Sequence, residues 1–130
     1  MKEQIITFET GELAKEKGFN CKIRSAFSGI GHHVSFHKNN FDWNDGVEYV
    51  SAPTQSLLQK WLREKHKLFV WVEPDEINKK SMCTYFIQSM DESIVINEFS
   101  EPRFKTWIMA NKTYEEALEK GLLEALKLIK

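Results

Sequence analysis

The sequence predicts a single α+β domain of residues 1–130, in which two longer helices and a short N-terminal helix pack on a three- to four-stranded, mainly antiparallel sheet. Its 130 residues are 42% hydrophobic and 28% charged, which is the composition of one globular domain with a packed core. Residues 53–66 and 113–129 repeat apolar side chains at the spacing of a helix face. Several segments within residues 68–109 alternate at the period of a strand, so helices and a sheet are expected to share a core.

The first predicted element is a short helix over residues 8–17. Thr7 or Thr10 can cap its first turn, because a threonine hydroxyl accepts a hydrogen bond from a free backbone N–H there. Gly18 follows the helix at the position where a left-handed residue is favoured, and Phe19 is then placed to fold back on the helix.

Residues 20–50 are the least regular part of the sequence. Glycine, asparagine and aspartate interrupt short apolar pieces throughout this segment. Residues 34–37 and 47–50 are the two pieces with strand character, and each is predicted to be a brief strand.

The second helix is predicted over residues 53–66. Pro53 is acceptable in its first turn, where the N–H that proline lacks would have no partner in any case. At 100° per residue the helix has a broad apolar face, which consists of Leu57, Leu58, Trp61 and Leu62. Its opposite face carries the basic residues Lys60, Arg63 and Lys67.

An antiparallel meander is predicted to follow this helix. Residues 68–73 alternate and should end at Pro74, which cannot donate to a sheet. Residues 82–90 and 93–100 alternate on either side of a tight turn, and residues 103–109 supply a fourth candidate strand.

The last helix has the strongest signal in the chain. Thr113 and Glu116 have the spacing of a capping box, and the helix stripe consists of Tyr114, Leu118, Leu122, Ala125 and Ile129. Gly121 lies within this stripe. A glycine there lowers helix propensity by about 1 kcal/mol relative to alanine, but it lets a strand or an aromatic side chain approach closely.

The segment 31–40 contains three of the four histidines, His32, His33 and His37, and is the obvious candidate for a metal or catalytic site. In a strand, His33 and His37 lie about 13 Å apart, too far to share one ion. Alternation places His33, Ser35 and His37 toward water and leaves His32, Val34 and Phe36 on the apolar side. We therefore predict a structural segment with no metal site, and a metal-dependent enzyme built on residues 31–40, with Cys21 as a further ligand, remains an alternative.

The basic face of helix 53–66 carries a second functional hypothesis. Lys60, Arg63 and Lys67 recur at spacings of three and four, so they would face the same way. They could contact either the phosphates of a nucleic acid or the surface of a partner protein. A solvated helix face explains the same residues, and the formal net charge of −1 disfavours a dedicated nucleic-acid binder.

The sequence lacks the short motifs that mark common catalytic, cofactor and membrane-spanning segments. The sequence has no CxxC, HExxH, GxSxG or Walker motif, so no enzymatic activity, catalytic residue, cofactor or metal is predicted. Neither a signal peptide nor an apolar run of about 18 residues is found, so we expect a cytoplasmic protein with no membrane contact. Cys21 and Cys83 are then expected to be free thiols.

Three stretches of the chain, FETGELAKEKGF, SAPTQSLLQKWLREKHK and KTYEEALEKGLLEALKLIK, resemble a group of uncharacterised small proteins encoded by phages and prophages of gut anaerobes. The resemblance covers a little over a third of the chain and implies a small α+β accessory protein of mobile DNA. Our leading hypothesis is a non-catalytic phage or prophage accessory protein that acts as a protein-binding module for a host or phage protein. The alternative is a nucleic-acid-associated accessory of replication or regulation.

Overall fold

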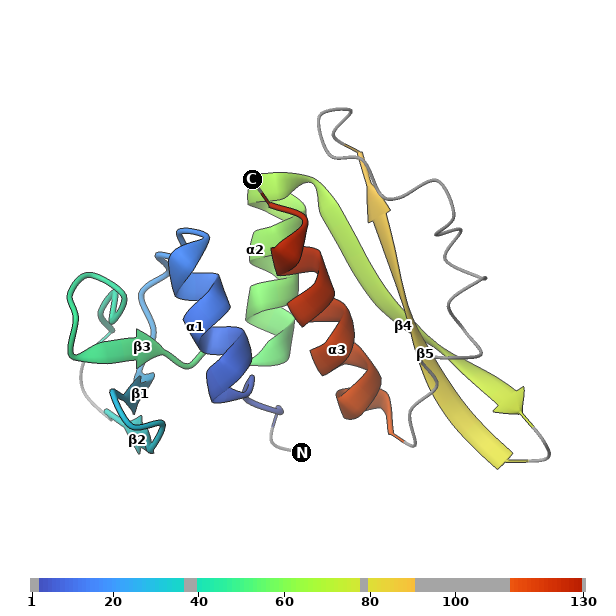
Figure 1. Ribbon diagram of the computed structural model, residues 1–130, viewed down its shortest axis with the longest axis horizontal. Helices are drawn as coiled ribbons and strands as arrows, with labels where there is room; N and C mark the ends of the chain where they lie inside the picture. The colour runs from blue at the N-terminus through green and yellow to red at the C-terminus, as the bar shows by residue number, and fades with distance from the viewer. Residues whose placement is uncertain (1–2, 37–39, 78–79, 91–112, 130) are drawn as a thin grey trace. The chain divides into compact units, whose positions relative to one another are not determined.

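The computed structural model describes residues 3–36, 40–77, 80–90 and 113–129. These residues form three helices and two antiparallel sheets, so the predicted α+β fold class and the short N-terminal helix are confirmed. Within this fold the chain divides into two compact units, Met1–Leu58 and Gln59–Lys130. Figure 1 shows the elements of each unit.

Helix α1 (Phe8–Glu16) begins and ends as its sequence predicts. Thr7 is the N-cap, and its hydroxyl accepts a hydrogen bond from the backbone N–H of Thr10. At the other end Gly18 has a φ of 94°, and Phe19 N–H donates to the carbonyl of Ala14 at 2.9 Å. This left-handed glycine cap folds Phe19 back against the helix, where it is fully buried.

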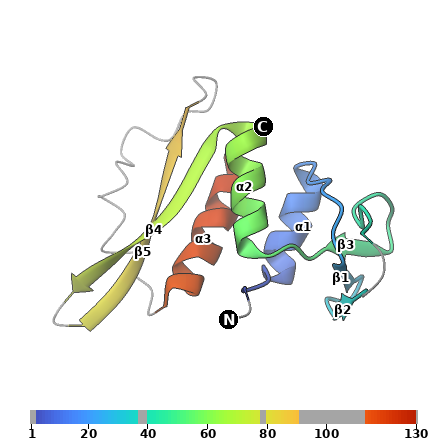
Figure 2. The ribbon, with the colours of Figure 1, turned by 180° about the vertical axis from the view of Figure 1, so that it is seen from behind.

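The first unit contains a three-stranded antiparallel sheet in the order β2-β1-β3. Its strands are β1 (Ser25–Ser28), β2 (His33–Ser35) and β3 (Tyr49–Ser51). Figure 2 shows α1 beside β3. Strands were predicted at residues 34–37 and 47–50, and β2 and β3 lie there with shifted bounds, whereas the central strand β1 was missed.

Helix α2 (Gln55–His66) lies across the boundary between the two units. It starts two residues later than predicted, because Thr54 caps it by accepting the N–H of Leu57 at 3.2 Å. Pro53 is therefore outside the helix, where its carbonyl accepts the N–H of Ile6 at 3.1 Å. Of the four residues on the predicted apolar face, Leu58, Trp61 and Leu62 are buried, whereas Leu57 is only half-buried.

Lys67 was predicted to lie on the basic face of this helix, but α2 ends before it. Lys67 has a φ of 56°, a left-handed conformation that ends a helix, so it does not belong to the helix face that carries Lys60 and Arg63. Its carbonyl instead accepts the N–H of Met90 beyond the second strand of the following hairpin.

The second unit contains a two-stranded hairpin of β4 (Leu68–Ile77) and β5 (Lys80–Ser89). The prediction that Pro74 ends its strand is wrong, since β4 continues through Pro74, which pairs with Cys83. A proline is tolerated where its nitrogen points away from the partner strand. In the described residues β4 has β5 as its one partner.

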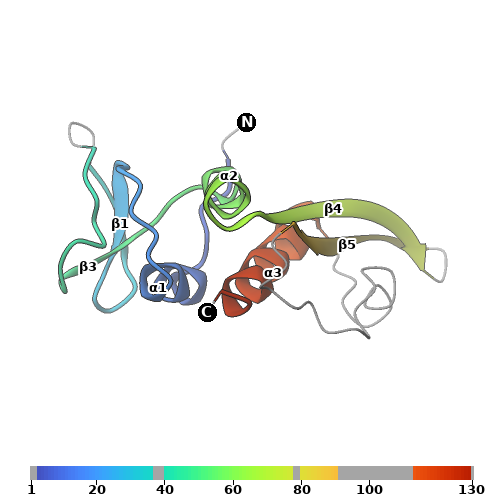
Figure 3. The same cartoon turned by 90° about the horizontal axis from the view of Figure 1, so that it is seen from above.

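Helix α3 (Tyr114–Lys127) contacts both strands of this hairpin, and Figure 3 shows it alongside them. The predicted N-cap is confirmed, because the Thr113 hydroxyl accepts the N–H of Glu116 at 3.1 Å. Most of the predicted stripe is buried, but Tyr114 is 48% exposed, since the first turn extends past the covered part of the helix face. The buried residues of α3 are Ala117, Leu118, Gly121, Leu122, Ala125 and Leu126.

Gly121 provides the close approach that its position in the stripe predicts. A Cβ at this residue would lie 2.9 Å from both Tyr85 Cβ and Val70 Cγ1. The two strands therefore approach the helix more closely than any side chain at this position would allow.

The predicted strands over residues 93–100 and 103–109 lie outside the described residues. The strands that are described form two separate sheets, because the irregular segment before α2 contributes its own sheet to the first unit. No helix of the described residues combines the length and the apolar character that crossing a bilayer requires.

Candidate binding pocket

The histidine segment forms the strand that the sequence predicts, but its faces differ in part from the expectation. His33 opposes Phe27 across the ladder and its ring lies 5.9 Å from the Phe27 ring, on a face expected to point only to water. Phe36 packs against other aromatic rings, as expected for the apolar side, whereas Val34 is exposed. His37 lies outside the described residues.

The candidate metal ligands are not brought together in the described part of the chain. His32 and His33 are exposed, and Cys21 and Cys83 are partly exposed cysteines that form no disulfide. Among the described residues, no group of three or more histidine, cysteine, aspartate or glutamate side chains is arranged to hold a metal ion.

The basic face of α2 is less positive than its sequence predicts. Lys60 and Arg63 are exposed on the helix, but the ammonium of Lys60 lies 3.9 Å from the carboxylate of Glu64, one turn later. Lys67 is outside the helix. The predicted row of three cations is therefore reduced to two on the helix, and one of these two has an acidic neighbour.

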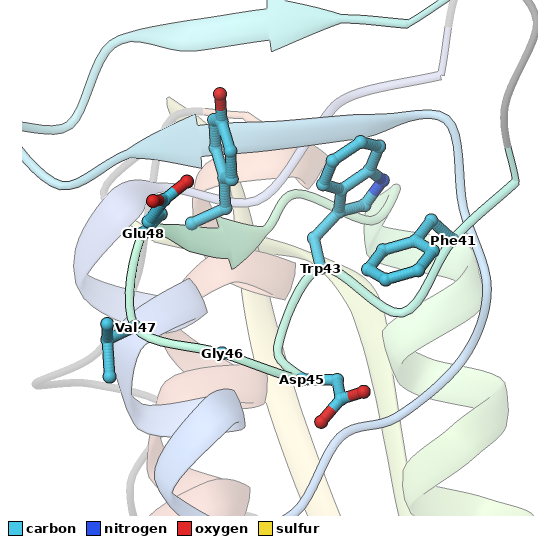
Figure 4. Close-up of a pocket in the computed structure, with 7 residues that line it drawn as sticks. Phe41, Trp43, Asp45, Gly46, Val47 and Glu48 are labelled. Atoms are coloured by element: carbon cyan, nitrogen blue, oxygen red, sulfur yellow. The ribbon is translucent and has the colours of Figure 1, made fainter.

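A pocket of about 400 Å³ lies instead in the irregular part of the first unit. It is formed by the loop before β3 and the start of that strand, and it is lined by Phe41, Trp43, Asp45, Gly46, Val47, Glu48 and Tyr49. Figure 4 shows the rings of Phe41 and Trp43 near each other, with Asp45 and Glu48 farther along the loop. The volume is in the lower part of the range for ligand sites, so it suits one or two side chains.

Trp43 is the centre of the aromatic cluster beside this pocket. The ring of Phe36 stacks on it at 4.2 Å between centroids, and the rings of Phe41 and Tyr49 meet it edge to face at 5.2 and 5.4 Å. The indole Nε1–H of Trp43 donates to the carbonyl of Ile23 at 2.8 Å. These contacts fix the orientation of the indole.

Asn44 fixes the first half of the pocket loop through three hydrogen bonds. Its side-chain Nδ2 donates to the carbonyl of Phe19 at 2.8 Å, and its Oδ1 accepts the N–H of Ser51 at 2.8 Å. Its own backbone N–H donates to Oδ1 of Asp42 at 3.1 Å, a local turn typical of aspartate. The loop is thereby connected to the end of α1 and to β3.

Lys15 fixes the second half of the loop from the last turn of α1. Its ammonium donates to the carbonyl of Gly46 at 2.5 Å and to the carbonyl of Tyr49 at 2.9 Å. Because both acceptors are backbone atoms, this contact holds the path of the chain rather than one side chain. Gly46 has a φ of 143°, a backbone conformation that glycine adopts without the steric cost of a side chain.

Sequence reasoning missed this site. The signal for it is the string FDWNDGVEY, in which three aromatic residues flank an Asn-Asp-Gly turn. That string was interpreted only as an irregular stretch with a brief strand. Comparison of the chain with protein families, with curated proteins and with solved structures found no match.

Proposed function

We propose that this protein is a non-catalytic binding module that takes up a segment of a partner protein in the pocket of residues 41–49. The observation that carries the proposal is an exposed aromatic pocket on a loop held in place by side chains. Phe41 is 47% exposed and Val47 is 95% exposed, although both are large apolar residues. Aromatic side chains are enriched at the centres of protein interfaces, where they contribute much of the binding energy.

The fixed loop supports binding in a second way. Ordering a flexible loop on association costs free energy that reduces affinity. The hydrogen bonds of Lys15 and Asn44 order this loop before any partner arrives. The binding surface is therefore already formed in the free protein.

The partner we propose is a host or phage protein, and the role is that of a cytoplasmic accessory of a phage or prophage. This part of the proposal rests on the resemblance of the α1, α2 and α3 sequences to such proteins. A nucleic-acid role gains less support, because Lys60 has Glu64 beside it and Lys67 lies outside the helix.

The test is affinity capture from infected or lysogenic cells with matched variants. Phe41→Ser changes an exposed ring of the pocket, and Ile30→Ser changes an equally apolar residue, 80% exposed, in the turn after β1. We expect the wild type and Ile30→Ser to retain the same partner and Phe41→Ser to lose it. The captured protein is then purified, and its dissociation constant is measured for all three forms by titration calorimetry.

Circular dichroism of each variant shows whether the fold is retained. Equal affinity of Phe41→Ser and Ile30→Ser for the purified partner would refute the pocket as the binding site. A partner that is lost from all three forms when salt is added, and that proves to be nucleic acid, would support the phosphate-binding alternative instead.

A further inference from the structure

The side-chain groups left for a ligand around the pocket of residues 41–49 are mainly hydrogen-bond acceptors. The Trp43 indole N–H already donates to Ile23, and the backbone N–H groups of Asp45 and Gly46 donate to carbonyls of the same loop. The carboxylates of Asp45 and Glu48 accept hydrogen bonds and do not donate them when ionised. Only the Tyr49 hydroxyl among the pocket side chains can still donate.

The charge of the loop has the same sign throughout. Residues 41–49 contain Asp42, Asp45 and Glu48 and no lysine or arginine. Asp45 and Glu48 are exposed, and Figure 4 shows them on the segment that borders the pocket. Lys15, the lysine that contacts the loop, directs its ammonium at two backbone carbonyls. A cationic ligand thus finds carboxylates that it can approach from solvent.

The rings of the pocket select among cations. Aromatic faces attract a positive charge placed over them, and a guanidinium adds planar stacking to this attraction. A guanidinium also has five N–H donors and no acceptor, which matches the carboxylate side chains and ring faces of this pocket. A lysine ammonium carries the same charge but is compact and more strongly hydrated.

We infer that the pocket binds the guanidinium group of an arginine side chain in the partner segment, an inference that rests on the proposed function. Phe41, Trp43 and Tyr49 provide the aromatic surface, and Asp45 and Glu48 provide the hydrogen-bond acceptors. The charge of the ligand and the charge of the loop are complementary, so arginine in a basic segment is the expected occupant.

The test uses short peptides that differ at one position. Arginine, lysine and citrulline stand in turn at the centre of an otherwise neutral, capped peptide, and citrulline keeps the shape of arginine without its charge. Binding to the full-length protein is followed by NMR through the indole N–H signal of Trp43, assigned with a Trp43→Phe variant. We expect the arginine peptide to shift this signal and the citrulline peptide to bind about tenfold more weakly, because a cation–π contact and charge-assisted hydrogen bonds are lost together.

Two charge variants complete the test. Asp45→Asn combined with Glu48→Gln should weaken arginine binding about tenfold, whereas Glu9→Gln, an exposed residue in the first turn of α1, should leave it unchanged. Equal binding of arginine and citrulline peptides would overturn the inference of a cation, and equal binding of lysine would overturn the choice of guanidinium.

Failure of this inference can be separated from failure of the proposed function. If no peptide shifts the Trp43 signal but Phe41→Ser still loses the captured partner, the pocket binds protein without recognising arginine. If the Trp43 signal instead shifts with protein concentration in the absence of peptide, a second copy of the chain occupies the pocket, and the inference is wrong.

Discussion

Replacement of Gly121 by alanine tests how closely α3 packs on the hairpin of β4 and β5. The added Cβ would lie 2.9 Å from Tyr85 Cβ and from Val70 Cγ1, and 3.1 Å from Tyr85 Cγ. Carbon atoms pack best at about 3.5–4.0 Å, so both strands and the helix must move apart. Tyr85 Cβ is attached to the strand backbone, so a change of side-chain rotamer cannot remove this contact.

Two opposing effects set the expected magnitude. Alanine is about 1 kcal/mol better than glycine inside a helix, whereas overpacking of a close-packed core costs about 1–3 kcal/mol. Three contacts at or near 3 Å, one of them to a Cβ on a strand, place this site toward the upper end of that cost. We expect Gly121→Ala to lower the free energy of unfolding by about 1–2 kcal/mol.

The assay is urea unfolding followed by far-ultraviolet circular dichroism. Lys120→Ala is the matched control, because Lys120 is the exposed neighbour in the same helix and should change stability by less than about 0.5 kcal/mol. If Gly121→Ala is as stable as the wild type or more stable, α3 does not approach the strands as described.

Three further predictions concern the second unit. Trp61→Ala should lower the free energy of unfolding by about 3–5 kcal/mol, because Trp61 is 7% exposed; a loss under about 1 kcal/mol in the same urea assay would contradict its burial. Thr113→Ala should cost about 1 kcal/mol by leaving the N–H of Glu116 without its cap, and an unchanged thermal midpoint would place the start of α3 elsewhere. The pKa of His66 lies below its ordinary value of 6.5, first because of burial and then because of the charge of Lys65. The unfolded state therefore takes up the proton first as the pH falls, so stability from neutral His66 is present above pH 6.5 and is lost as the pH falls from 6.5 to the folded pKa. His66→Gln should make the free energy of unfolding less dependent on pH in that range, and an NMR titration of His66 at or above 6.5 would refute the shift.

The helices were largely predictable because their signals are local. The Thr113 cap and the glycine that follows α1 depend on residues three to five positions apart, and the structure contains both. The start of α2 was harder to predict, since Thr54 and Pro53 both fit a helix start. A hydrogen bond from Ile6 to Pro53, far away in the sequence, decides between them.

The sheets were less predictable because strand pairing depends on distant residues. β1 has four residues, too few to show a clear alternation, and it becomes the central strand by pairing with β2 on one side and β3 on the other. Pro74 was interpreted as a strand end, but the effect of a proline depends on which side its nitrogen faces. That side is set by the register with β5.

The pocket was not predicted because it is lined by aromatic residues, a residue type that is just as common in a buried core. Phe41, Trp43 and Tyr49 could equally have been buried, and the sequence does not give their exposure. The residues that hold the loop are also distant in sequence. Lys15 lies 31 positions before Gly46, so its hydrogen bond to that carbonyl has no local signal.

The contact of Lys15 with the pocket loop couples local unfolding of the end of α1 to local unfolding of the loop. Lys15 belongs to the last turn of α1, and both of its acceptors belong to the loop and the start of β3. When this turn of the helix frays, the loop loses both hydrogen bonds, so the two segments tend to open together. By thermodynamic linkage, a ligand that binds only the ordered loop also stabilises the helix end. Occupancy of the pocket should therefore slow hydrogen exchange of the backbone amides of Lys17 and Gly18, which cap α1.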